Sequence, residues 1–96
     1  MKTMLVLNLM PELEEDMVDF LLANPHVGGF TSYRTRGHGE HANMSLAEQV
    51  SGRRRRLQFE VILEEAAISE LVGGLAEGVG KDILYWQQAI SNLGKV

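Results

Sequence analysis

Two histidines and a carboxylate lie close together in the middle of this chain. The segment Gly37-His38-Gly39-Glu40-His41 places two imidazoles three residues apart, with Glu40 between them. Imidazole nitrogens and carboxylate oxygens are ligands that zinc, nickel and copper(II) accept. We therefore predict a metal site at His38, Glu40 and His41, with a divalent transition metal as the candidate cofactor. Two polar residues in an exposed loop would give the same pattern, and a closed site would need a further donor, such as His26 or a group from another subunit.

A run of four arginines follows this segment, at Arg53, Arg54, Arg55 and Arg56. Residues 28–58 carry six Arg against two Glu, whereas the segments on either side are both acidic. Guanidinium groups pair well with phosphate and carboxylate oxygens, so this run is predicted to contact an acidic protein partner. Arginines solvated on a loop and its strand stems are the alternative. Nucleic acid is not expected, because Glu60 interrupts the third strand where stacking aromatics would be needed.

Enzymatic chemistry is not predicted. The chain has no cysteine, its serines lack a recognisable nucleophile context, and its acids fall at helix starts and on solvated faces. The first strand ends at Leu9-Met10-Pro11, which offers no arginine cradle of the kind that acylphosphatase-like enzymes need. No secretory signal or membrane-spanning apolar run is recognised, so we expect a cytoplasmic protein without membrane insertion.

Periodicity along the 96 residues predicts a single domain with alternating strands and helices. Residues 3–10 alternate as a strand, and Pro11 opens a helix that Asn24-Pro25 ends. Strands are expected at 30–36, 57–63 and about 82–89. A second helix with the stripe Ile68, Leu71, Val72 and Leu75 is expected to begin at Glu64-Glu65 and to end at a left-handed Gly78. The order predicts an α+β, ferredoxin-like βαββαβ fold: a four-stranded antiparallel sheet with both helices on one face.

The sheet face away from the helices is predicted to be apolar. Its candidates are Met4, Val6, Met10, Ile62 and either Tyr85 or Trp86. A monomer would expose this surface to water, so we expect a homo-oligomer built sheet against sheet.

With this order of elements, the sequence resembles the nitrogen-regulatory PII family, and more closely the small PII-like proteins of unsettled function. The second strand followed by Gly37-His38-Gly39 is similar to the family's segment before its long T-loop. The insertion at about 37–55 then occupies the T-loop position, and Gly78-Val79-Gly80-Lys81 looks like the B-loop. The resemblance implies a homotrimer and a role in signal transduction, with transport systems among the possible protein partners.

In the PII family the two glycine loops hold a nucleotide between subunits. By position, the resemblance implies Gly37, Gly39, Gly78, Gly80 and Lys81 as nucleotide-binding residues. Glu40-His41 replaces the family's Arg-Gln pair, and this carboxylate would repel phosphate but attract a cation. We therefore expect a non-enzymatic regulatory or adaptor protein that senses a transition metal and contacts its partner through the central loop; the alternative is a nucleotide-binding PII-type signal transducer.

Overall fold

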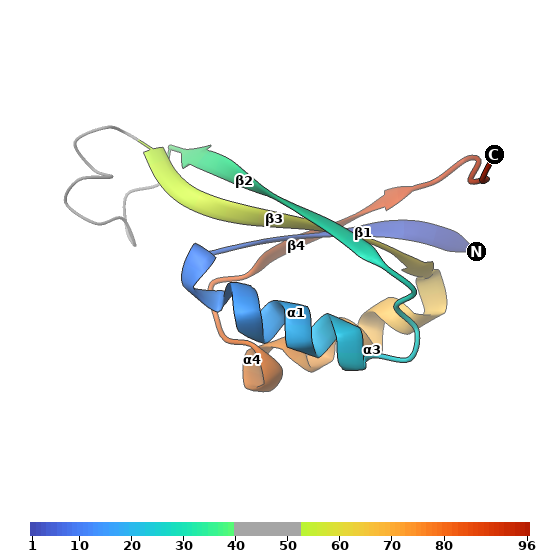
Figure 1. Ribbon diagram of the computed structural model, residues 1–96, viewed down its shortest axis with the longest axis horizontal. Helices are drawn as coiled ribbons and strands as arrows, with labels where there is room; N and C mark the ends of the chain where they lie inside the picture. The colour runs from blue at the N-terminus through green and yellow to red at the C-terminus, as the bar shows by residue number, and fades with distance from the viewer. Residues whose placement is uncertain (40–52) are drawn as a thin grey trace.

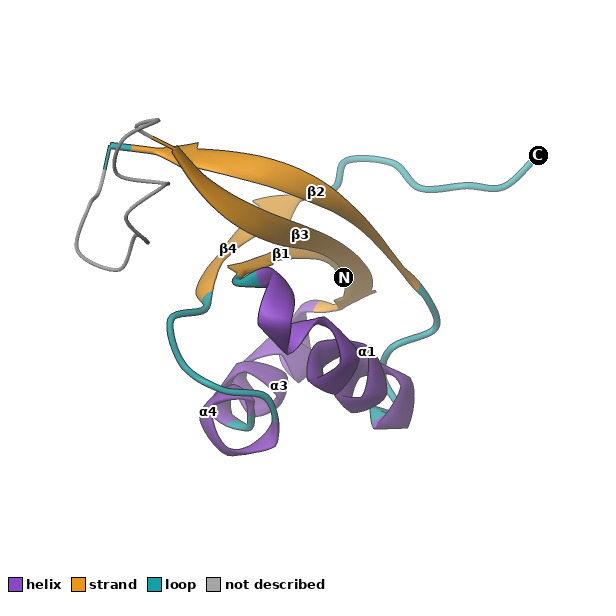
Figure 2. Cartoon of the chain, turned by 60° about the vertical axis from the view of Figure 1, so that its left-hand side comes forward, coloured by secondary structure: helices purple, strands orange, loops and turns teal. Residues whose placement is uncertain are grey.

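The computed structural model describes residues 1–39 and 53–96, and it confirms the ferredoxin-like α+β fold. Four antiparallel strands form one sheet in the order β2-β3-β1-β4. The strands are β1 (Lys2–Leu9), β2 (Phe30–His38), β3 (Arg53–Glu64) and β4 (Leu84–Ala89). The described helices cover one face of this sheet, and within residues 1–39 and 53–96 no helix lies on the other face (Figures 1 and 2).

The first helical segment begins with η1 (Pro11–Leu13) and continues as α1 (Glu14–Ala23). Pro11 suits the first helical position, where its missing N–H costs no hydrogen bond. Acidic side chains in the first turn of α1 interact favourably with the positive end of the helix dipole. Met17 and Leu21 are fully buried, as the predicted apolar stripe requires.

The second helical segment consists of three short pieces instead of the single predicted helix. These pieces are η2 (Glu65–Ala67), α3 (Ile68–Gly73) and α4 (Leu75–Gly78). Gly74 separates α3 from α4, and glycine is a poor helix former in an interior position. The predicted stripe is nevertheless correct, because Ile68, Leu71 and Leu75 are buried and Val72 packs against them.

The core lies between the helices and one face of the sheet. Strand alternation places Leu5, Leu7 and Leu9 of β1 on this face, with Leu57, Phe59, Val61 and Leu63 of β3 beside them in register. Most of these side chains are fully buried. Each fully buried side chain of this size contributes about 1.5–3 kcal/mol relative to its exposed state. The two central strands therefore anchor the fold, and the edge strands β2 and β4 are set against them.

The described strands are longer than predicted around the central insertion. β2 continues to His38 and β3 begins at Arg53, so the arginine run belongs to a strand. β1 pairs with β3 only as far as Leu57. The strand pair formed by Thr35–His38 and Arg53–Arg56 therefore has no neighbour in β1, and we call it the arm (Figure 1).

Gly78 has a structural role that differs from the predicted left-handed cap. Among the described glycines, positive φ occurs at Gly39 (102°) and Gly80 (155°), and Gly78 is not one of them. A Cβ atom at Gly78 would instead lie 2.7 Å from the ring of Phe20 in α1. Gly78 thus permits the close packing of α4 on α1.

A Gly78→Ala variant should be less stable than the parent protein. The added methyl group must displace the Phe20 ring, and overpacking of this kind costs about 1–3 kcal/mol. Gly73→Ala is the matched control, because a Cβ at Gly73 meets nothing within 4 Å. Chemical denaturation should give a lower midpoint for Gly78→Ala and an equal or higher one for Gly73→Ala. Equal midpoints for the two variants would show that this contact does not matter.

Candidate functional site

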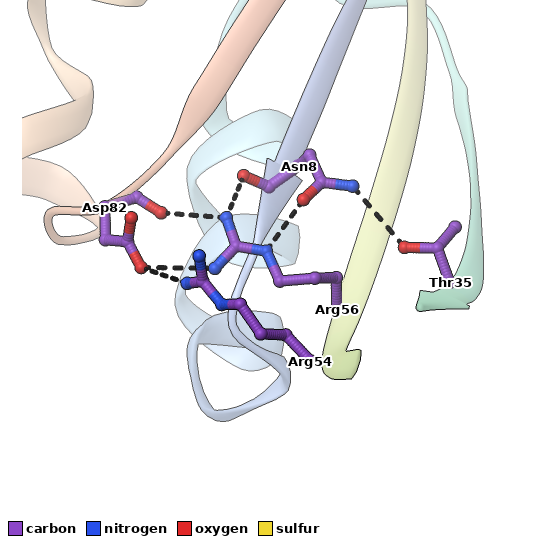
Figure 3. Close-up of polar contacts among 5 residues, drawn as sticks. All are labelled: Asn8, Thr35, Arg54, Arg56 and Asp82. Carbon is purple, nitrogen blue, oxygen red and sulfur yellow. Dashed lines mark hydrogen bonds and ion pairs between the residues drawn. The ribbon is translucent and has the colours of Figure 1, made fainter. Parts of the chain in front are cut away.

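A buried arginine connects the arm to the opposite side of the sheet. Arg56 is only 5% exposed, although it belongs to the run that was predicted to be a contact surface. Its Nε donates to Asn8 Oδ1 at 2.7 Å, and its Nη2 donates to the main-chain oxygens of Asn8 and Asp82 at 2.8 and 3.1 Å. Its Nη1 lies 3.2 Å from Asp82 Oδ2 (Figure 3). A buried guanidinium is tolerated only with such partners.

Asp82 also forms an ion pair with a second arginine of β3. Arg54 Nη2 donates to Asp82 Oδ2 at 2.8 Å, so one carboxylate pairs with two guanidinium groups (Figure 3). Asp82 adopts a positive φ of 60°, a conformation that aspartate tolerates better than most residues. This backbone turn aims both its carboxylate and its main-chain oxygen at β3. The segment that follows Gly80-Lys81 is thereby fixed to the arm.

These groups surround a hollow of about 290 Å³ on the sheet face away from the helices. Its described lining is Asn8, Gly37, His38, Arg54, Arg56, Asp82 and Leu84. The hollow therefore brings the end of β2, with Gly37 and His38, together with Asp82, which directly follows the second glycine-containing segment. We call it the outer hollow.

The predicted nucleotide-binding residues fall into two groups in the structure. Gly37 lines the outer hollow, and Gly39 directly follows β2. Gly78 and Gly80 pack against the helical layer, since a Cβ at Gly80 would lie 3.2 Å from Leu13. Lys81 is exposed and is not among the described lining residues. Close packing against Phe20 and Leu13 thus explains why glycines occupy positions 78 and 80.

The predicted metal site is only partly described. His38 is exposed at the end of β2 and shares the outer hollow with the carboxylate of Asp82. Glu40 and His41 lie outside the described residues. Across residues 1–39 and 53–96, no three histidine or acidic side chains gather in a metal-binding group. The described donors supply one imidazole and one carboxylate, so a complete site depends on Glu40, His41 or another subunit.

The arginine run divides between the two faces of the sheet. Arg54 and Arg56 point to the outer face and pair with Asp82, whereas Arg55 alternates to the helix side. Arg53 begins β3 at the end of the arm. At least Arg54 and Arg56 of the four predicted partner-binding arginines are therefore engaged within the chain.

A polar strip runs across the outer face beside this hollow. Asn8 Nδ2 donates to Gln58 Oε1 at 3.0 Å, and Gln58 Nε2 donates to Tyr33 Oη at 2.9 Å. Tyr33 Oη donates to Glu60 Oε2 at 2.7 Å. This hydrogen bond to a carboxylate raises the pKa of the Tyr33 hydroxyl above its ordinary value. Only the Glu60 member of this strip was predicted from the sequence. The strip shows that the outer face is only partly apolar.

The apolar part of the outer face is smaller than predicted. Met4 and Ile62 are half-buried neighbours in register, and Val6 is only 1% exposed between Glu60 and Trp86. Val6 is already covered within the chain and offers no surface to a partner. Of the two aromatic candidates, Trp86 lies on the outer face in register with Val6, and Tyr85 lies on the helix side in register with Leu7.

Comparison with known proteins yields a family and a fold. A family model described as "Protein of unknown function (DUF3240)" matches residues 1–96. The chain is similar to a DUF3240 family protein from Shewanella baltica OS155, whose crystal structure superposes with a TM-score of 0.81. The two chains are 23% identical over 99% of this chain and 96% of the other. A comparison with curated proteins gave no match.

Removing the charge of Asp82 should destabilise the protein. An Asp82→Asn variant keeps the size and tolerates the same backbone conformation, but it leaves two guanidinium groups without their shared carboxylate. Hydrogen bonds to charged groups contribute about 1.5–3 kcal/mol each, so a loss of roughly this size in the free energy of unfolding is expected.

Asp19→Asn, on the exposed side of α1, is the matched control for this charge removal and should leave the free energy of unfolding unchanged. Both variants can be compared with the parent by urea denaturation. If they behave alike, the Arg54–Asp82–Arg56 cluster does not stabilise the fold.

Proposed function

Because the chain belongs to the DUF3240 family, whose function is unknown, we propose its role from the geometry of its own residues. The protein is a non-enzymatic regulatory or adaptor protein. It senses a small ligand at the outer hollow and reports the ligand to a protein partner through the arm and the central insertion. A PII-like relationship, proposed from the two glycine segments, fits this role, with signal transduction as the general activity.

One observation carries this proposal: the outer hollow contains the ion pairs that fix the arm. His38 and Gly37 lie on the arm itself, and Asp82 holds Arg54 and Arg56 from across the sheet. A cation that recruits the Asp82 carboxylate would release the two arginines. An anion that recruits Arg54 would release Asp82. Either ligand would change the restraint on the arm, because the groups that bind the ligand are the same groups that hold the arm in place.

A transition metal is the first candidate ligand, with His38, Glu40 and His41 as its donors. His38 lines the same hollow as Asp82, and imidazole with carboxylate suits such ions. A nucleotide is the second candidate, and Arg54 and Gly37 in the same hollow favour it. Only the family resemblance implies that the nucleotide site also includes Gly39, Gly78, Gly80 and Lys81.

Isothermal calorimetry with zinc, nickel, copper(II) and ATP distinguishes the two ligands. We expect at least one metal to bind with a Kd of about 1–10 µM, corresponding to roughly 7–8 kcal/mol. His38→Ala/His41→Ala should abolish this heat, while Lys81→Ala serves as the control that keeps it. Micromolar ATP binding that is lost in Lys81→Ala, without heat from any metal, would reverse the order of the candidates.

We also propose that the protein acts in the cytoplasm as a homotrimer, as the resemblance implies. No helix within the described part of the chain is long and apolar enough to cross a membrane. The whole of β4 is exposed, with Leu84 at 60%, Tyr85 at 52% and Trp86 at 38%. An edge strand with such side chains favours association, which supports an assembly built on this edge and the adjoining outer face.

Sedimentation equilibrium tests the assembly. The 10.7 kDa chain should sediment as a trimer, and Trp86→Lys should shift it towards the monomer by placing a charge on the outer face. Leu22→Lys is the matched control, because Leu22 is a 70% exposed apolar residue on α1, away from the outer face. A parent protein that is monomeric at micromolar concentration would rule out the trimer.

A further inference from the structure

Three arginines gather on the helix side of the arm. Alternation along β2 places Arg34 and Arg36 on the same side, and the strand register sets Arg36 directly opposite Arg55 of β3. All three residues are exposed. They line a hollow of about 630 Å³ together with Pro11 at the start of η1, which we call the inner hollow. It opens on the face of the arm opposite to the Arg54–Asp82 pair.

The charges of Arg34 and Arg36 are not balanced by a described acid, whereas Arg54 and Arg56 pair with Asp82 on the other face. Arg36 lies directly opposite Arg55 in the antiparallel pair, so guanidinium groups from both strands are close to the hollow. Neither Arg34 nor Arg36 forms an ion pair with any acid in residues 1–39 or 53–96. No carboxylate is among the described lining residues. Among the described residues, Arg34 and Arg36 therefore give the hollow positive charge without a matching acid.

We propose that the inner hollow binds a small molecule that carries a diphosphate group. Planar guanidinium groups form paired hydrogen bonds with phosphate oxygens, and a diphosphate offers enough oxygens and charge for several arginines at once. The volume falls within the range of about 300–1,000 Å³ that is typical of small-ligand sites. The site uses neither the histidines nor Asp82. Arg56 lines both hollows, but its guanidinium is held by Asn8 and Asp82, so the exposed arginines Arg34 and Arg36 distinguish this site from the outer hollow.

Binding at this site would act on the arm from its second face. A diphosphate that bridges Arg36 and Arg55 would link β2 to β3 through charge-assisted hydrogen bonds. The bound state would therefore hold the two strands of the arm together more firmly than the free state. The inner hollow thus gives the arm an input that is separate from the ion pairs on its outer face.

Calorimetry with inorganic pyrophosphate tests the proposal directly. The parent protein should bind it with a Kd in the micromolar range, and Arg34→Gln/Arg36→Gln should weaken binding about ten-fold or more, because it removes charge-assisted hydrogen bonds. Lys2→Gln/Lys95→Gln removes the same charge from elsewhere and should bind like the parent. Arg54→Gln, which alters the other face, should also retain pyrophosphate binding. Binding should weaken steeply with added salt, as expected for exposed charges.

Separate readouts keep a negative result interpretable. Arg34→Gln/Arg36→Gln should unfold at an equal or higher denaturant concentration, because it relieves repulsion between exposed arginines. Its response to zinc, nickel and copper(II) should match that of the parent, so a failure here is distinct from a failure at the outer hollow.

Three results would overturn the proposal. One is the absence of pyrophosphate heat in the parent, and another is equal binding by the parent and the double variant. The third is equal affinity for citrate, which would indicate attraction by charge alone. A further outcome would indicate a different occupant of the inner hollow. If pyrophosphate does not bind and Arg34→Gln/Arg36→Gln changes the sedimentation of the protein, the two arginines contact a second copy of the chain, whose acidic first turn of α1 has the complementary charge.

Discussion

The buried guanidinium of Arg56 is the interaction on which the functional end of this molecule depends. In residues 1–39 and 53–96 the hydrophobic core ends at Leu9 and Leu57, and no apolar layer formed by these residues holds the arm to the rest of the sheet. Arg56 takes over this task with four hydrogen bonds that reach β1 and the segment before β4. Because a charge this deeply buried must keep its partners, the positions of Asn8 and Asp82 are fixed as well. An apolar side chain at position 56 could fill space, but it could not determine where Asp82 lies.

This dependence explains why polar contacts hold the arm, whereas apolar packing holds the rest of the sheet. Apolar packing gains free energy with little regard to orientation, whereas a carboxylate shared by two arginines has a small number of good geometries. Another charge can also disrupt such a cluster, whereas it cannot disrupt packed leucines. The arm is therefore attached by the one kind of contact that a small charged ligand could compete with, and this property links its construction to the proposed regulatory role.

The sequence predicted the fold because its signals are local and regular. Alternating leucines in β1 and β3, Pro11 before the acidic turn, and the stripe in the second helical segment each have one structural solution. The break at Gly74 and the contact of Gly78 with Phe20 were not predicted, since they depend on the distance between α4 and α1 and not on local propensity. The sequence also overestimated the apolar outer face, because it could not show that Val6 is covered by its neighbours in register.

The arginine run shows most clearly what a linear reading misses. Read as a loop, four consecutive arginines form one positive surface. Read as a strand, they alternate, so Arg54 and Arg56 join Asp82 on one face while Arg55 joins Arg34 and Arg36 on the other. Alternation could have suggested this division, but the partners could not be named without the register of β2 and β3 or the turn at Asp82. One basic segment thus supplies a buried structural cation and an exposed cationic cluster, and the chemistry of the arm follows from the two-residue period of a strand.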